Sequence, residues 1–299
     1  MKKVAIYGQS YSISAEKEMQ ILLEVLNENN IVSFIEHKFY DLLVEGNILD
    51  KKYPTFSHFS DLNDSFDAMF TLGGDGTILR AVTYIRDLKI PILGINTGRL
   101  GFLATINKKN ITESINLILN GEFSIQERTL LSVKTSPETP AFKELNFALN
   151  EVTIARKNTT SMIGVKTCLN NEYLTNYWAD GLIIATPTGS TGYSLSCNGP
   201  VISPDSENFI ITPIAPHNLN ARPMVISDKT SIQLTVDSRE KDFLISLDSR
   251  ITTVPKNTQV FIEKAEFTIQ SIIPKNQSFL QTLRTKLLWG EDTRNETNL

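Results

Sequence analysis

The first 120 residues alternate between short apolar runs and segments with helical spacing, and this alternation is the strongest constraint on the fold. The apolar runs cover residues 4–7, 31–35, 68–72 and 90–95. Between them, apolar side chains recur every three or four residues, as at Met19, Leu22 and Leu26, which is the spacing of one helix face. Strands that alternate with helices are typical of a parallel sheet covered by helices. We therefore predict an N-terminal Rossmann-like α/β domain.

The pattern changes after a predicted helix over residues 111–119. Many short runs rich in Val, Ile, Thr and Phe follow between residues 123 and 273, separated by Pro, Gly, Asn and Asp. This texture is typical of an antiparallel sandwich or barrel. Helical spacing returns over residues 278–289. Since no third core is available, we expect this last helix to pack back on the first domain.

These patterns predict two domains of different class in a chain of 299 residues. Residues 1–122, joined by 275–299, form the α/β domain, and residues 123–274 form a β-rich, sandwich-like domain. Residues 41–63 are weakly patterned, and we expect a long connection there that could be mobile.

Charge and cysteine usage exclude several classes of protein. A net charge of −4 gives no pull toward nucleic acid or an anionic membrane. No apolar stretch approaches the roughly 20 residues of a membrane span. Cys168 and Cys197 lack the spacing of a zinc site and imply no disulfide framework. We expect a cytoplasmic protein with no nucleic-acid or membrane partner.

A glycine-aspartate turn, Gly73-Gly74-Asp75-Gly76, stands where a predicted strand ends and a helix begins. Ligands of open parallel sheets gather at such strand ends. Glycine backbone with a helix N-terminus can cradle phosphate oxygens. A carboxylate beside phosphates repels them unless it binds a metal or accepts a proton, so Asp75 is a candidate general base. Taken alone, a purely structural turn is about as plausible.

Two further segments contain polar residues that suit the same chemistry. Asn96-Thr97-Gly98, followed by Leu100-Gly101-Phe102, comes after the next strand and should line the same sheet edge as Asp75. Asn150-Glu151 offers donors and acceptors suited to the vicinal hydroxyls of ribose. As an isolated dipeptide it has little weight, because solvated strand edges are far commoner.

A third segment couples a buried apolar strand to a loop dense in hydroxyls. It runs from Asp180-Gly181 through Thr186-Pro187-Thr188-Gly189-Ser190-Thr191 to Tyr193-Ser194. Such a loop can hydrogen-bond a nucleotide and offer a ring for stacking.

Together these motifs resemble the NAD kinase family, in the expected order and over nearly the whole chain. The resemblance implies an α/β domain, a β-rich domain, NAD bound between them, and a homodimer or homotetramer. It implies transfer of a phosphoryl group from ATP or polyphosphate to the 2′-hydroxyl of NAD, giving NADP. A divalent cation, Mg²⁺, would be bound through the donor phosphates without a protein cage.

The resemblance also implies site residues. Asp75 would be the catalytic proton acceptor. The NAD- or nucleotide-binding residues would be Gly73, Gly74, Asp75, Gly76, Arg80, Asn96, Asn150, Glu151, Asp180, Thr188, Thr191, Gly192, Tyr193, Ser194, Leu195, Ser196 and Ala215.

One position departs from the family pattern, and two other functions compete with this one. Many members carry a basic residue two positions before the Asp-Gly of the third motif, where this chain has Trp178. A cationic contact there is missing or replaced by ring packing. A lipid kinase would share the glycine-aspartate turn, but it would leave Asn150-Glu151 and the segment from Thr188 to Tyr193 unexplained. A non-catalytic NAD(P) sensor would use the same residues without turnover.

Overall fold

The computed structural model describes residues 1–9, 13–49, 51–98, 101–158, 161–218 and 220–288. The chain forms two compact units. Unit 1 comprises Met1–Glu127 and Ile269–Leu299, and unit 2 comprises Arg128–Thr268. The unit boundaries lie inside two long strands, β7 (Phe123–Ser136) and β18 (Gln259–Pro274), so each of these strands begins in one unit and ends in the other.

The sheet of unit 1 is parallel, as the alternation of elements predicts. Its strands are β1 (Lys3–Gly8), β2 (Val32–Glu36), β3 (Thr55–Phe56), β4 (Ala68–Gly73), β5 (Ile92–Asn96) and β6 (Ile106–Asn107). The hydrogen-bonded order is β18-β5-β4-β1-β2-β3, with β6 beside β5. The register pairs Gly8 with Leu72 and Gly73 with Asn96, so the carboxyl ends of β1, β4 and β5 meet at one sheet edge.

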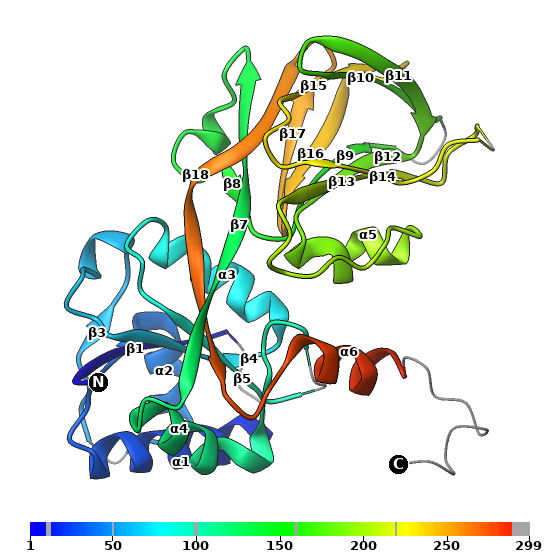
Figure 1. The fold of residues 1–299 in the computed structure, drawn as a ribbon. Coiled ribbons are helices and arrows are strands. Elements are labelled where there is room, and N and C mark those ends of the chain that lie inside the picture. The colour runs from blue at the N-terminus through cyan, green and yellow to red at the C-terminus, as the bar shows by residue number, and fades with distance from the viewer. Residues whose placement is uncertain (10–12, 50, 99–100, 159–160, 219, 289–299) are drawn as a thin grey trace, which may run out of the picture. The chain divides into compact units, whose positions relative to one another are not determined.

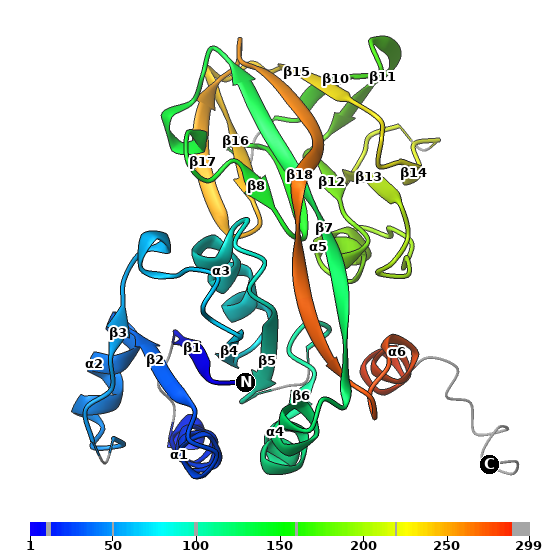
Figure 2. The ribbon, with the colours of Figure 1, turned by 60° about the vertical axis from the view of Figure 1, so that its left-hand side comes forward.

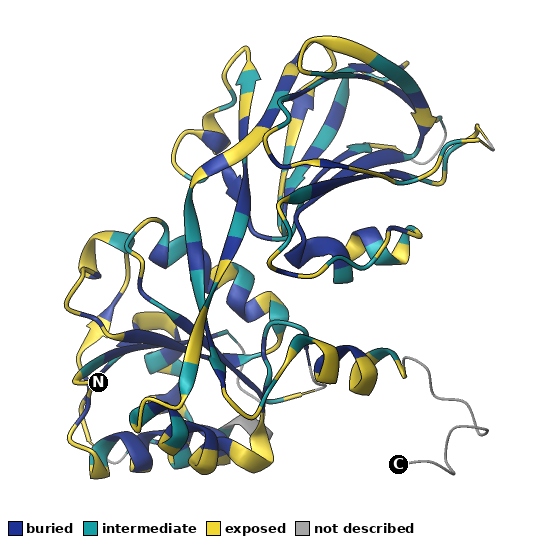
Figure 3. Cartoon of the chain, viewed as in Figure 1, coloured by how far each residue is buried: buried dark blue, intermediate teal, exposed yellow. Residues whose placement is uncertain are grey.

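Helices cover both faces of this sheet. They are α1 (Ile13–Glu28), α2 (His37–Glu45), α3 (Asp75–Ile85), α4 (Ile111–Leu119) and α6 (Phe279–Leu287), with 3₁₀ turns η1 (Phe59–Asp61) and η2 (Lys108–Asn110). α1 and α4 lie side by side on one face and α3 lies on the other (Figures 1 and 2). The central strands are buried, whereas the helices keep one exposed side (Figure 3). Met19, Leu22 and Ile115 are fully buried in the core.

The expected long connection over residues 41–63 is wrong, because this segment holds short elements that are anchored in unit 1. It contains the end of α2, strand β3 and turn η1. Leu43, Tyr53 and Phe56 are buried there. The apolar anchors are few and irregularly spaced, so they produce no periodic signal in the sequence.

The C-terminal helix packs on the first unit, as predicted. Ser278 caps α6 by accepting the N–H of Gln281, and Leu283 is buried. The ammonium of Lys286 lies 5.2 Å from the centre of the Phe102 ring. Trp289, the end of the predicted helix, lies outside the described residues.

Unit 2 is a sandwich of two antiparallel sheets. One has the order β14-β13-β12-β9-β16-β17, and the other contains β11-β10-β15-β18, with β7 pairing β18 and β8. Residues of both sheets, such as Ile184 and Leu234, share one core, so the sheets pack face to face. The strands are β8 (Phe147–Ala148), β9 (Glu151–Arg156), β10 (Ile163–Leu169), β11 (Glu172–Ala179), β12 (Gly181–Ala185), β13 (Asn208–Ile214), β14 (Met224–Ser227), β15 (Ile232–Asp237), β16 (Asp242–Leu247) and β17 (Arg250–Pro255). Three short helices complete the unit: η3 (Pro140–Phe142), η4 (Thr188–Thr191) and α5 (Tyr193–Ser196).

Candidate active site

The glycine-aspartate turn joins β4 to α3 at the carboxyl edge of the unit 1 sheet. Gly73 ends the strand with φ +152°, and a Cβ there would lie 2.1 Å from Thr77 Oγ1. This position therefore requires glycine. A Cβ at Gly74 or Gly76 would meet no atom within 4 Å. The space beside these two residues is therefore free of protein atoms, and a phosphate needs such space to approach the backbone closely.

Asp75, the first residue of α3, is held by the backbone of a separate loop. Its Oδ2 accepts the N–H of Phe102 at 2.8 Å, and its Oδ1 accepts those of Leu103 and Ala104 at 3.0 Å each. The loop comes so close that a Cβ at Gly101 would lie 1.8 Å from Oδ1. Each carboxylate oxygen accepts about two bonds. Oδ2 therefore keeps the capacity to accept one more donor while the carboxylate is fixed in orientation.

Asn96 lies at the end of β5, opposite Gly73 in the parallel register. Its side chain is buried, and its Oδ1 accepts the N–H of Gly98 at 2.8 Å. Asn96 therefore shapes the turn that follows β5. Leu100, which the same predicted motif includes, lies outside the described residues.

Arg80 offers an oriented positive charge in the second turn of α3. It lies one helical turn after Gly76 on the same side of the helix, and it is exposed. With the Gln9 amide turned so that its oxygen faces Arg80, that oxygen accepts from Nε and from one Nη at 2.8 Å each. A neutral amide orients the guanidinium without cancelling its charge, which leaves Arg80 suited to an anion.

In unit 2, Asn150 and Glu151 bring unpaired polar atoms to one place. Asn150 Oδ1 and Glu151 Oε2 are buried without a hydrogen-bond partner among the described residues. A Cβ at Gly192 would lie 3.2 Å from Glu151 Oε2 and 3.4 Å from Asn150 Nδ2. Buried polar atoms that lack partners are costly. A ligand with hydroxyl groups would supply the missing bonds.

Glu151 also has a strongly shifted acidity. Burial, and secondly the neighbouring Asp248 carboxylate, raise the pKa of Glu151 to about 8, while the backbone N–H of Tyr193 acts in the opposite direction. Burial raises the pKa of Asp248 as well, but three backbone N–H groups and, after them, the guanidinium of Arg250 act in the opposite direction. These contacts stabilise the anion of Asp248, so the proton of the pair resides on Glu151. Perturbed acids are common at functional sites.

Several hydroxyls of the segment that runs from the end of β12 into α5 face the interior. Thr186 Oγ1 donates to the carbonyl of Leu149 at 2.6 Å. Ser190 Oγ is buried and contacts the backbone of Ile202. Ser194 Oγ is fully buried 2.8 Å from Thr212 Oγ1. The dense hydroxyl pattern of this motif thus serves in part to hold the loop itself.

Other predicted residues of this segment are more open. Tyr193 is 45% exposed, which leaves its ring available for stacking. Leu195 and Gly192 are half-buried, and Ser196 is exposed. Thr188 is buried, and its carbonyl accepts from Thr191 Oγ1 at 3.3 Å.

Asp180 is already paired within unit 2. Arg156 Nη2 lies 2.9 Å from Asp180 Oδ2. Arg156, on the neighbouring strand β9, therefore supplies a cation near Trp178, which is 45% exposed and lines the same cavity. Ala215 is exposed after β13 and has φ +43°.

Two residues that the sequence reasoning missed join this site. Asp248 accepts the N–H groups of Leu149, Asn150 and Glu151 at 3.0, 2.8 and 3.2 Å. Arg250 donates to the carbonyls of Leu145, at 2.8 Å, and Phe147. The available signal was a polar turn between two runs of alternating hydrophobicity, residues 247–250, which is indistinguishable from an ordinary hairpin turn.

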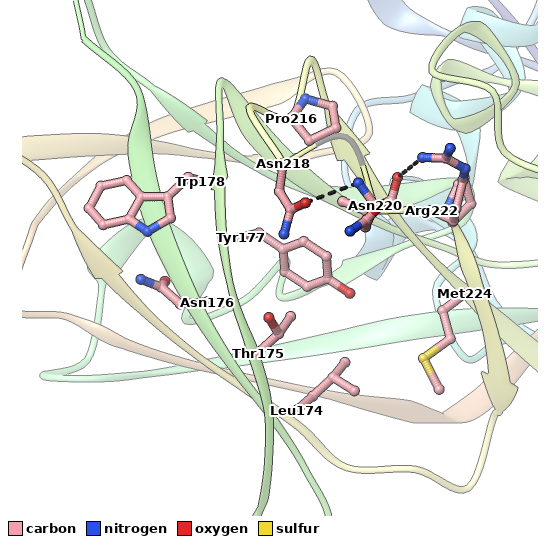
Figure 4. Close-up of a pocket in the computed structure, with 12 residues that line it drawn as sticks. Leu174, Thr175, Asn176, Tyr177, Trp178, Pro216, Asn218, Asn220, Arg222 and Met224 are labelled. Atoms are coloured by element: carbon pink, nitrogen blue, oxygen red, sulfur yellow. Dashed lines mark hydrogen bonds between the residues drawn. The ribbon is translucent and has the colours of Figure 1, made fainter.

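Two cavities of unit 2 are lined by residues other than those predicted for the site. One of about 360 Å³ is lined by β11 and by residues 216, 218 and 220–224, including Tyr177, Trp178 and Arg222 (Figure 4). The other, of about 500 Å³, is lined by Arg156 and Arg239 among others. Neither contains a predicted site residue.

The described part of the chain contains neither a cluster of metal ligands nor a helix suited to a membrane. There, no three His, Cys, Asp or Glu side chains gather as metal ligands. In the same residues, no helix is long and apolar enough to cross a membrane.

Comparisons with known proteins agree with the motifs. The family model of the ATP-NAD kinase N-terminal domain matches residues 4–123, and that of the ATP-NAD kinase C-terminal domain matches residues 149–273. The NAD kinase of Christiangramia forsetii is 54% identical over 98% of this chain and 100% of its own length. The NAD kinase of Flavobacterium johnsoniae is 53% identical, with the same coverage of both chains.

Solved structures show the same fold. Yeast NADH kinase in complex with NADH superposes with a TM-score of 0.84 at 20% identity, covering 99% of this chain and 89% of that one. An NAD kinase from Archaeoglobus fulgidus in complex with ATP gives a TM-score of 0.74 at 25% identity, covering 96% and 98%. The match to both domain models decides against the lipid kinase alternative. The chain belongs to the NAD kinase family, the phosphotransferases that convert NAD to NADP.

Proposed function

We propose that this enzyme transfers the terminal phosphoryl group of ATP to the 2′-hydroxyl of the adenosine ribose of NAD, with Asp75 as the general base. The observation that carries the assignment is the setting of Asp75. Three backbone N–H groups orient its carboxylate at an open glycine turn, and Oδ2 retains capacity to accept a proton donor.

The reaction then needs only a few steps from the chain. The 2′-hydroxyl donates its proton to Asp75 while its oxygen bonds to the terminal phosphorus of the donor. The bond from that phosphorus to the bridging oxygen breaks, and ADP leaves with the electron pair. Phosphoryl transfer of this kind depends mostly on positioning and electrostatics, and a general base adds about 10²- to 10⁴-fold in rate.

The acceptor is held by residues of unit 2. Asn150 and Glu151, whose side chains have unpaired buried atoms, bind the ribose hydroxyls. The exposed ring of Tyr193 stacks on a base of the dinucleotide. Further contacts of NAD or the donor nucleotide are assigned to Gly73, Gly74, Asn96, Asp180, Thr188, Thr191, Gly192, Ser194, Leu195, Ser196 and Ala215.

The donor phosphates are held by unit 1. The open backbone of Gly74 and Gly76 and the oriented guanidinium of Arg80 suit phosphate oxygens. A divalent cation, Mg²⁺, would be held by these phosphates rather than by protein side chains, and it would neutralise part of their charge. ATP or polyphosphate could serve as donor, and paired assays with each decide between them.

The direct test is to incubate the purified protein with NAD, ATP and MgCl₂ and to measure NADP with an NADP-specific dehydrogenase. We expect NADP formation that stops when a chelator removes the metal. Failure to form NADP with either ATP or polyphosphate would contradict the proposal and favour the sensor alternative. Cytoplasmic location and a homodimer or homotetramer remain predictions, and light scattering of the purified protein tests the latter.

A further inference from the structure

The segment that presents Asn150 and Glu151 is irregular in backbone structure. β8 ends at Ala148, and β9 begins at Glu151. Side chains of consecutive residues in a regular strand point to opposite faces. Asn150 and Glu151 instead both lie against Gly192, as the distances of 3.4 and 3.2 Å from its Cβ position show. The break in the strand is therefore what lets two neighbours in sequence reach the same place.

The break leaves backbone groups without ladder partners, and side chains satisfy them. On the N–H side, Asp248 accepts from Leu149, Asn150 and Glu151. Its own N–H donates to the Glu151 carbonyl at 2.9 Å, which closes a ring of contacts around the pair. On the carbonyl side, Thr186 binds Leu149 and Asn150 through its hydroxyl and N–H.

Arg250, two residues after Asp248, holds the segment just upstream. Its guanidinium donates to the carbonyls of Leu145 and Phe147 and lies 5.4 Å from the centre of the Phe147 ring. Thus Asp248 binds backbone N–H groups and Arg250 binds backbone carbonyls, both from one hairpin turn. A regular hairpin needs neither contact, because its own ladder satisfies the backbone.

We propose that the turn Asp248–Arg250 is a clamp that positions Asn150 and Glu151 for the ribose of NAD. The proposal rests on the proposed function for its ligand. Asp248 and Arg250 act through the backbone of the segment and need not touch the substrate, so they are positioning residues. The clamp therefore affects binding of the dinucleotide, whereas the donor phosphates are bound by unit 1.

The test compares Asp248→Asn with Asp242→Asn, a matched change in the same hairpin at an exposed ion pair with Lys157. Asp248→Asn presents an amide N–H to backbone donors, so we expect the KM for NAD to rise about 10- to 100-fold. The KM for ATP should stay within about twofold, and Asp242→Asn should resemble the wild type. Equal rises in both KM values, or no rise for NAD in a folded variant, would overturn the clamp.

A second variant covers the case in which Asp248→Asn does not fold. Arg250→Lys keeps the charge and can bind only one of the two carbonyls well. We expect a smaller rise in the KM for NAD, about threefold to tenfold, again without a change for ATP. An unchanged KM for NAD in Arg250→Lys would count against the clamp.

The pH profile gives a readout that a merely structural role would not move. The charge of Asp248 raises the pKa of Glu151, so the midpoint of the pH dependence of NAD binding should move to lower pH in Asp248→Asn. The groups that face Glu151 are Asp248, the phenol of Tyr193 and, through Asp248, Arg250. An unmoved midpoint in a variant that still binds NAD would contradict the clamp.

Direct methods separate this proposal from the proposed function. Calorimetric NAD binding and hydrogen exchange of amides 149–151 need no turnover. Loss of protection at these amides with weaker NAD binding supports the clamp even where no NADP forms, whereas retained protection in Asp248→Asn refutes it. Absence of NADP formation by the wild type refutes only the kinase chemistry.

Discussion

Asp75 in unit 1 and Asp248 in unit 2 make the same kind of contact in different settings. Each carboxylate accepts three backbone N–H groups from a segment distant in sequence. Asp75 lies half-buried at a turn whose glycines leave open space. Asp248 lies against a second carboxyl group, Glu151, and a guanidinium, Arg250.

The difference separates two uses of one arrangement. At Asp75 the N–H groups orient a carboxylate that still has acceptor capacity toward a ligand. At Asp248 the carboxylate instead serves to hold these N–H groups, because they belong to the segment that carries Asn150 and Glu151. The number of hydrogen bonds to a carboxylate therefore does not identify a catalytic base, whereas the space and charge around the carboxylate do.

The largest expected effect tests the catalytic side of this comparison. Asp75→Asn removes the proton acceptor, so turnover should fall about 10²- to 10⁴-fold while NAD binding is retained. Turnover near the wild-type rate in a steady-state NADP assay would assign Asp75 the same purely positioning role as Asp248. Thermal unfolding of the variant controls for loss of the bonds to residues 102–104.

A second variant displaces Asp75 without changing it. In Gly101→Ala the new Cβ would lie 1.8 Å from Asp75 Oδ1, so the carboxylate must move. Misplacement by about 1 Å can cost about 10²-fold in rate, and we expect a loss of this size in kcat with little change in the KM for NAD. Gly98→Ala, where a Cβ meets no atom within 4 Å, serves as the control for stability.

Because Glu151 and Asp248 form a buried pair of acids in unit 2, we expect the stability of the protein to depend on pH. The pKa of Glu151 is about 8 in the folded chain against 4.5 for the free group. Between these values the folded state holds a proton that the unfolded state has lost, so the free energy of unfolding decreases as pH rises. Between pH 6 and pH 8 the free energy of unfolding of the wild type should fall by about 2 kcal/mol on account of Glu151. Glu151→Gln should not show this fall.

Urea denaturation at both pH values measures that slope. Glu207→Gln, at an exposed site 3.9 Å from Lys229, is the control and should keep it. The same Glu151→Gln variant should bind NAD more weakly above pH 8, where the native carboxylate has two acceptor oxygens and the amide offers one. A parallel loss of slope in both variants would place its origin elsewhere in the chain.

The smallest effect concerns a residue with two possible roles. Ser194→Ala leaves the buried Thr212 hydroxyl without its partner at 2.8 Å, which should lower the free energy of unfolding by about 1 kcal/mol. Because the side chain is fully buried, the contact assigned to Ser194 must go through its backbone, so the KM for NAD should stay within about twofold. A rise above about fivefold would instead make Ser194 Oγ a ligand contact.

The sequence predicted the two classes of domain, the parallel and antiparallel sheets and the returning C-terminal helix. It failed at residues 41–63, where Tyr53 and Phe56 are buried without any periodic pattern around them. At the site it indicated Asp75 and the pair Asn150 and Glu151, but it missed Asp248 and Arg250. A polar hairpin turn looks the same in sequence whether it faces water or binds another segment.

The sequence by itself determined the succession of strands and helices, because the spacing of apolar side chains is a local property that each element carries within its own residues. It also determined the family, through motifs that are contiguous in the chain. Only the tertiary structure decided which distant groups meet. Asp75 binds a loop 27 to 29 residues away, and Asp248 binds a segment 97 to 99 residues away. Such contacts depend on how the sheets bring strand ends together, which no local pattern encodes.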